Sequence, residues 1–141
     1  DGHIRLTDFG LAKDGVRGSA EGTRTFCGTP EYLAPEILLN KGHGTAVDWW
    51  SLGTLLYEML GGLPPFYDAN VQKMYSKILN APLKVPSTFS DSAEDVVRQL
   101  LERDVDRRLG SDGFDDIKKH AFFADFLDFD KVYRKEYAPE F

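Results

Sequence analysis

A carboxylate near the start of the chain has a sequence context that suits metal chemistry. Asp8 opens the run Asp8-Phe9-Gly10, and polar and apolar residues alternate over residues 3–7, which predicts a short strand directly before it. A carboxylate at such a strand-to-loop junction can reach a Mg²⁺ ion that bridges nucleotide phosphates, because Mg²⁺ prefers oxygen ligands. The tripeptide alone is not specific, since a turn with a buried Phe has the same composition.

Three further motifs follow Asp8-Phe9-Gly10 in a fixed order. They are TFCGTPEYLAPE at residues 25–36, DWWSLG at residues 48–53 and GLPPF at residues 62–66. On these motifs the chain resembles an AGC-group Ser/Thr protein kinase of the Akt, SGK and cyclic-nucleotide-dependent type, over essentially all of its length. The resemblance implies ATP and Mg²⁺ as cofactors and transfer of the γ-phosphoryl group to Ser or Thr in protein substrates with basic residues near the phosphoacceptor.

The resemblance assigns roles to the first motif. Asp8 is expected to coordinate Mg²⁺ and so to help bind the nucleotide, and its loss is expected to abolish phosphoryl transfer. Phe9 is expected to pack beneath an upper lobe and to differ between active and inactive arrangements. Gly10 gives the backbone room to change between them.

Thr25 occupies the position that resembles the activating phosphorylation site of the family. A phosphate there would add nearly two negative charges, and Lys13 matches a residue that helps to neutralise them. An upstream activating kinase is therefore an expected partner. Ser19 and Thr23 are interpreted as ordinary loop hydroxyls.

The resemblance also implies a substrate-docking surface after the phosphosite. Phe26, Pro30 and Leu33 are expected to form an apolar pocket for the substrate residue that follows the phosphoacceptor. Thr29 resembles the hydroxyl that supports the catalytic Asp and Lys of Ser/Thr kinases. Glu58 matches an acidic residue that recognises substrate arginine, which suits the bidentate bonding of a guanidinium; the alternative is a carboxylate that is only solvated at a helix edge.

Four other residues are expected to be architectural. Glu36 is predicted to pair with Arg108, which would tie the activation segment to the distal helices. Asp48 is predicted to hydrogen-bond the backbone of a catalytic loop from below. Cys27 is interpreted as a small packing residue.

Periodicity and turn residues predict a mostly α chain, which corresponds to the C-terminal lobe of the protein-kinase fold. Asp91 and Glu94 are expected to cap one helix, and residues 14–25 are expected to form a mobile loop. We expect a partial kinase domain over residues 1–123 and the start of an AGC-type tail over residues 124–141. Residues 128–141 of this tail are expected to form an extended arm anchored by Phe129, Tyr133 and Tyr137. Helices are expected over residues 35–39, 45–60, 69–79, 91–101, 115–119 and 121–126, with the one strand at the N-terminus.

Composition narrows the expected partners and compartment. The chain has 17 basic and 23 acidic residues and a net charge of -6, so nucleic acid is not an expected partner. The apolar run around residues 49–60 is interrupted by polar residues and is shorter than a membrane span requires. A single cysteine, Cys27, favours a reducing compartment, the cytoplasm or the nucleus.

The 141 residues contain no Gly-rich loop, no strand lysine and no His-Arg-Asp motif, all of which a kinase needs. The chain alone is therefore expected to be inactive and to need the N-terminal half of a kinase domain, where the catalytic Asp would lie. Two alternatives are a truncated or pseudokinase-like regulatory or binding module, and an unrelated helical interaction domain.

Overall fold

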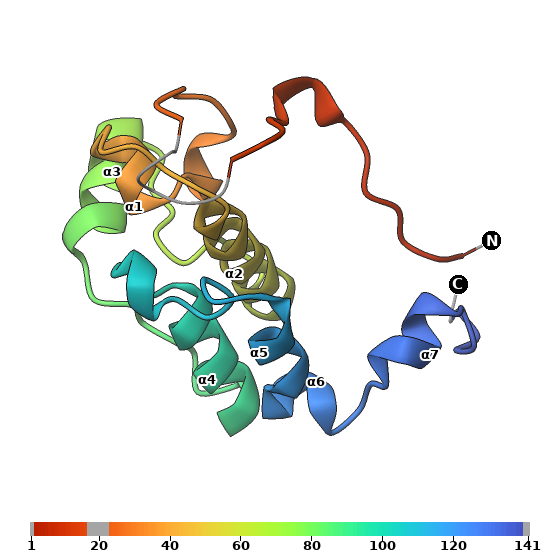
Figure 1. The fold of residues 1–141 in the computed structure, drawn as a ribbon. Helices are drawn as coiled ribbons and strands as arrows, with labels where there is room; N and C mark the ends of the chain where they lie inside the picture. The colour runs from red at the N-terminus through yellow and green to blue at the C-terminus, as the bar shows by residue number, and fades with distance from the viewer. Residues whose placement is uncertain (1, 17–22, 140–141) are drawn as a thin grey trace.

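The computed structural model describes residues 2–16 and 23–139, and helices dominate it, as predicted (Figure 1). Residues 17–22 of the predicted loop lie outside the described residues, so its mobility stays a prediction. None of the helices in the described ranges is long and apolar enough to cross a membrane. In chain order the elements are the 3₁₀ turns η1 (Phe9–Leu11) and η2 (Pro30–Tyr32), helices α1 (Pro35–Leu38), α2 (Ala46–Gly61), α3 (Val71–Asn80) and α4 (Asp91–Leu100), the 3₁₀ turn η3 (Val105–Arg107), and helices α5 (Phe114–Lys119), α6 (Ala121–Ala124) and α7 (Phe129–Tyr133).

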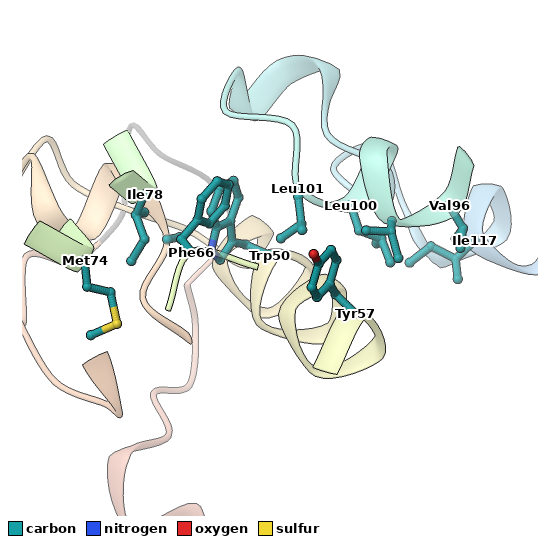
Figure 2. Packing of buried hydrophobic residues seen from close by; sticks show 11 residues of the cluster. Trp50, Tyr57, Phe66, Met74, Ile78, Val96, Leu100, Leu101 and Ile117 are labelled. Atoms are coloured by element: carbon teal, nitrogen blue, oxygen red, sulfur yellow. The ribbon is translucent and has the colours of Figure 1, made fainter. Parts of the chain in front are cut away.

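Helix α2 is the central element, because apolar residues occupy most of its faces. Helix α4 packs along it, α1 lies beside α3, and α5 and α6 lie next to α4 (Figure 1). Figure 2 shows the core that these helices share, with Phe66 stacked on Trp50 at a ring distance of 6.1 Å. The other buried members of this core are Ala34, Tyr57, Met74, Ile78, Val96, Val97, Leu100, Leu101 and Ile117.

Gly53 allows the close contact between α2 and α4. A Cβ atom at this position would lie 2.7 Å from the Cβ of Leu100 and 3.2 Å from side-chain atoms of Leu101. Only glycine fits at that distance without movement of one helix. The face of α2 that carries Gly53 is therefore fixed against α4.

The N-terminus of α4 differs from the sequence prediction. Ser90, not the pair Asp91 and Glu94, caps the helix: its Oγ accepts a hydrogen bond of 3.2 Å from the backbone N–H of Ala93. Asp91 is already the first helical residue, and Glu94 instead pairs with Arg98 one turn later at 2.7 Å. Ser90 has the extended backbone that a capping residue needs, which explains the shift.

The short strand predicted over residues 3–7, whose partner strand was expected upstream of this sequence, is not formed in the described residues. A strand is stable only when a neighbouring strand pairs with it, and none of the described residues forms a strand with this segment. Ile4 and Leu6 are both largely exposed as a result. The only β-bridge in the described chain joins Thr23 to His43 in antiparallel orientation.

The C-terminal tail also departs from the extended arm that was predicted. Asp128 accepts hydrogen bonds from the N–H groups of Asp130 and Lys131 and so caps the short helix α7. Phe129 packs edge-on to Phe114, with ring centroids 5.5 Å apart, and close to Phe123. The hydroxyl of Tyr137 accepts a hydrogen bond from the Asp128 N–H at 3.0 Å. Phe129 and Tyr137 are thus anchors, whereas Tyr133 is 90% exposed and is not.

Candidate functional site

Asp8 lies at the start of η1 with its side chain exposed and its backbone in the left-handed region, at φ 60°. A Cβ atom added to Gly10 would be 3.5 Å from Oδ1 of Asp8, an ordinary contact, so the glycine is not needed there for space. No group of three or more His, Cys, Asp or Glu side chains in the described ranges could hold a metal ion. Mg²⁺ is commonly held by one or two carboxylates together with substrate phosphates and water, and a single exposed carboxylate fits that mode.

Asp8 faces a cavity of about 670 Å³ between η1 and the first turns of α2. Lys13, Thr25 and His43 line the same cavity, and Asp48 lines it from α2. The structure therefore places three predicted residues around this one cavity. They are the metal ligand Asp8, the phosphosite Thr25 and the catalytic-loop support Asp48.

Thr25 is exposed and its hydroxyl is already in contact with a cation. Lys13 Nζ donates hydrogen bonds to the hydroxyls of both Thr23 and Thr25, and these two hydroxyls are 3.1 Å apart. The backbone of Thr23 pairs with that of His43 through hydrogen bonds of 3.1 and 3.0 Å, which holds the segment close to α2. Thr23, interpreted from sequence as an ordinary loop hydroxyl, shares the contact with Lys13.

The three residues predicted to form an apolar substrate pocket differ in exposure, and the pocket itself stays a prediction. Phe26 is 58% exposed and meets Tyr75 of α3 edge-on at 6.3 Å, whereas Leu33 is only 4% exposed. Pro30, half-buried, is the first residue of η2. Leu33 lines a second cavity, of about 480 Å³, together with the exposed Thr29.

Tyr32 connects η2 to the face of α2 that carries Glu58. Its hydroxyl donates a hydrogen bond to the Glu58 carboxylate, and the Ser51 hydroxyl donates to its carbonyl oxygen at 3.0 Å. The bond to Glu58 is the main cause that raises the pKa of Tyr32 to about 12, and partial burial adds to it. Glu58 is half-buried and bonded, so it is more than a solvated carboxylate at a helix edge.

Glu36 and Arg108 lie together in the interior. Arg108 donates to both carboxylate oxygens of Glu36, at 2.6 and 2.9 Å, and it is only 2% exposed. It also donates to the carbonyl oxygens of Ala46 and Glu102, and its guanidinium lies 5.3 Å from the ring of Trp50. The pair joins α1, which follows the segment predicted to dock substrate, to the loop that follows η3.

Asp48 lines both cavities from the first turn of α2. The surrounding protein partly removes water from its carboxyl group and raises its pKa, while the nearby His43 opposes that shift. Burial lowers the pKa of His43. The predicted bond from Asp48 to a catalytic loop stays a prediction, because these 141 residues contain no such loop.

Sequence reasoning missed two residues that hold the site together. Tyr32 and Ser51 are linked across 19 positions of sequence, and no local pattern predicts that pairing. The one available indication was the spacing of Ser51 and Glu58, which are about two helical turns apart and therefore share a face of α2. The backbone pairing of Thr23 with His43 had no indication in the sequence.

Comparisons with known proteins all point to one family. A family-wide sequence profile described as "Protein kinase domain" matches residues 1–123. The chain is 57% identical over 136 residues to Protein kinase 2 of Dictyostelium discoideum, which covers 96% of this chain and 28% of that protein. It is 54% identical to the serine/threonine protein kinase ypkA of Aspergillus fumigatus, over 99% of this chain and 22% of that protein. Identity to human serine/threonine-protein kinase Sgk2 is 50%, over 99% of this chain and 38% of that protein. The chain thus spans well under half the length of these relatives.

Proposed function

The chain belongs to the protein kinase family, and from that membership we propose that it is the C-terminal-lobe part of an ATP-dependent Ser/Thr kinase with basophilic substrates. The matches to Ser/Thr kinases agree with the AGC-type resemblance of the sequence. The observation that carries the proposal is the partly exposed segment from Thr25 to Tyr32, held on α2 with Glu58 bonded beside it. This arrangement supports a surface on which a peptide is bound and oriented.

Asp8 is proposed as the residue of this chain that binds Mg²⁺ and, through it, the nucleotide phosphates. When bound, Mg²⁺ with ATP supplies charge neutralisation for the transferred phosphoryl group. The exposed carboxylate and the adjoining cavity of about 670 Å³ support this role. The general base and the other phosphate contacts are proposed to come from sequence outside these 141 residues, so the chain alone is proposed to be inactive.

Substrate selection is proposed to rest on charge and on a small apolar surface. Glu58 would accept hydrogen bonds from a substrate arginine, because a carboxylate matches the guanidinium fork. Phe26 and Pro30 would contact the residue after the phosphoacceptor, and Leu33 would support them from the interior. Thr29, exposed at the start of η2, is proposed to orient the catalytic groups of the other half.

Thr25 is proposed as a regulatory phosphorylation site that an upstream kinase modifies. Its exposure gives access to the hydroxyl, and the Lys13 ammonium beside it would pair with the phosphate. Lys13 also contacts Thr23, so phosphorylation would draw the whole 23–25 segment toward η1. We propose that the protein works in the cytoplasm or nucleus, for which the single cysteine is the support.

The test of this function is an assay of phosphoryl transfer by the full-length protein that contains this chain. With radiolabelled ATP, Mg²⁺ and an arginine-containing serine peptide, we expect the wild-type protein to label the peptide and Asp8→Asn to lose at least about 100-fold in rate, or ~2.7 kcal/mol. Asp112→Asn changes an exposed carboxylate far along the chain and serves as the control. Equal rates for Asp8→Asn and the control would refute the role of Asp8.

A further inference from the structure

The face of α2 opposite α4 holds Tyr32 at two points. The Ser51 hydroxyl donates to the Tyr32 carbonyl oxygen at 3.0 Å, and the Tyr32 hydroxyl donates to Glu58. The Tyr32 N–H in turn donates to the carbonyl oxygen of Thr29 at 3.0 Å, which closes η2. The amide, the carbonyl and the hydroxyl of one residue are thus all fixed.

Helix α2 is a rigid support for these contacts. Gly53 lies on the opposite face, where an added Cβ would be 2.7 Å from Leu100 of α4 and 3.2 Å from Leu101, which follows it, so α2 is closely packed there. Ser51 and Glu58 therefore stand at a fixed separation of about two helical turns, or ~10 Å along the axis. Tyr32 spans that separation, with its backbone at one end and its hydroxyl at the other.

The Ser51 hydroxyl has a choice of partners within its own helix. Serine in a helix commonly bonds to the carbonyl oxygen four residues earlier. Here the hydroxyl instead donates to a different element, η2, and satisfies the part-buried carbonyl oxygen of Tyr32. Loss of this donor would leave that oxygen unpaired and free the backbone of η2 to move.

We propose that Ser51 is a positioning residue for substrate selection: it holds the Tyr32 backbone so that the Tyr32 hydroxyl fixes the Glu58 carboxylate for a substrate arginine. The bond from Tyr32 uses Oε2 of Glu58, so Oε1 would accept from the guanidinium. A guanidinium thereby meets a carboxylate whose rotamer is already set. The inference rests on the proposed role of Glu58 in the kinase.

Two readouts on the full-length protein test the inference. The first is the titration of Tyr32, followed by NMR of labelled tyrosine, which needs no activity. The second is KM and kcat for a serine peptide with arginine before the phosphoacceptor and for its arginine-to-alanine counterpart. The variants are Ser51→Ala, Ser51→Thr, which keeps the hydroxyl, and Glu58→Gln, with Ser76→Ala on the exposed side of α3 as the matched control.

We expect Ser51→Ala to lower the pKa of Tyr32 toward 10.0, the ordinary value for tyrosine. It should also raise KM for the arginine peptide by about three- to tenfold, with kcat within about twofold and little effect on the alanine peptide. Ser51→Thr should restore both values, and Ser76→Ala should change neither. A purely structural role would instead move KM for both peptides together.

Other outcomes separate the inference from the proposed function. An unchanged Tyr32 titration in Ser51→Ala would overturn the inference whatever the kinetics. A lowered Tyr32 pKa with intact arginine preference would also overturn it, and loss of preference in Glu58→Gln would then leave the proposed function standing. If Glu58→Gln too kept the preference, the role of Glu58 would be refuted and the inference with it.

Discussion

Thr25 and Lys13 form the contact most directly open to regulation, because a neutral hydroxyl and an ammonium group already touch in an exposed position. A phosphate on Thr25 would convert this weak contact into a charge-assisted pair. The geometry is therefore set before modification occurs, and modification would change its strength.

We predict that Thr25→Ala lowers the peptide kinase rate of the activated full-length protein by at least about tenfold, or ~1.4 kcal/mol. Loss of the phosphate leaves Lys13 with only neutral partners, so the segment is held less firmly. Steady-state kinetics after treatment with the activating kinase measures the effect. Thr88→Ala removes an exposed hydroxyl from a distant turn and should leave the rate unchanged; an equal rate for Thr25→Ala would rule out the regulatory role.

Tyr32 makes the contact with Glu58 sensitive to high pH. Its folded pKa of about 12 lies above the ordinary value of 10.0, so the neutral phenol is favoured in the folded state. The stability from this contact is complete below pH 10 and is lost as pH rises through 12.

We therefore predict that Glu58→Gln brings the pKa of Tyr32 down toward 10.0, because the main cause of its rise is removed. The unfolding midpoint of the variant should fall less steeply than that of the wild type between pH 10 and pH 12. NMR titration and urea unfolding measure the two effects. In Glu94→Gln, which alters an exposed carboxylate, Tyr32 should titrate as in the wild type, and a high Tyr32 pKa in Glu58→Gln would contradict the assignment.

Between elements, the Glu36–Arg108 pair is a buried polar connection with two hydrogen bonds. Both side chains are buried, and the two hydrogen bonds run in parallel. Such a pair adds little net stability relative to apolar residues, but removal of one partner leaves a buried charge. The pair thus makes the attachment of α1 specific.

We predict that Glu36→Gln destabilises the folded protein by about 3 kcal/mol, within the ~3–5 kcal/mol range for a broken buried pair. The matched control is Glu94→Gln in the exposed Glu94–Arg98 pair, whose cost should be below about 1 kcal/mol. Urea unfolding gives both values. Equal costs for the two variants would show that burial of the Glu36 pair has no energetic consequence.

Contact between α2 and α4 depends on Gly53. We predict that Gly53→Ala costs about 1–3 kcal/mol, because its Cβ would meet Leu100 at 2.7 Å. Gly61→Ala, near the end of the same helix, would meet Phe89 at 3.5 Å and should be neutral or stabilising by up to ~1 kcal/mol. Thermal unfolding ranks the two variants, and a Gly53→Ala protein as stable as Gly61→Ala would refute the close approach.

Helices with clear periodicity could be located from the sequence, and elements that depend on distant partners could not. Helix α2 begins and ends within one residue of its predicted bounds, because its apolar residues and Gly62 are local features. The strand over residues 3–7 failed since alternation of residues does not supply a pairing neighbour. Helix α7 was missed because the cap that starts it, Asp128, stands in a short run with little periodicity.

Across the whole molecule, the residues of the candidate site also divide into those that local motifs predict and those that depend on distant contacts. The resemblance predicted roles for Asp8, Thr25, Glu36 and Glu58, and the structure places the first two at one cavity. The resemblance could not predict the roles of Tyr32 and Ser51, because these roles arise from contacts between distant segments.

Transfer of label from [γ-³²P]ATP to a matched pair of peptides by the full-length protein tests the central claim most directly. One peptide carries a serine preceded by arginines, and the other has the arginines replaced by alanine. The account predicts label on the serine of the first peptide, at least about tenfold less on the second, and a much smaller difference between them in Glu58→Gln. Absence of transfer to either peptide, or equal transfer to both by the wild-type protein, would contradict it.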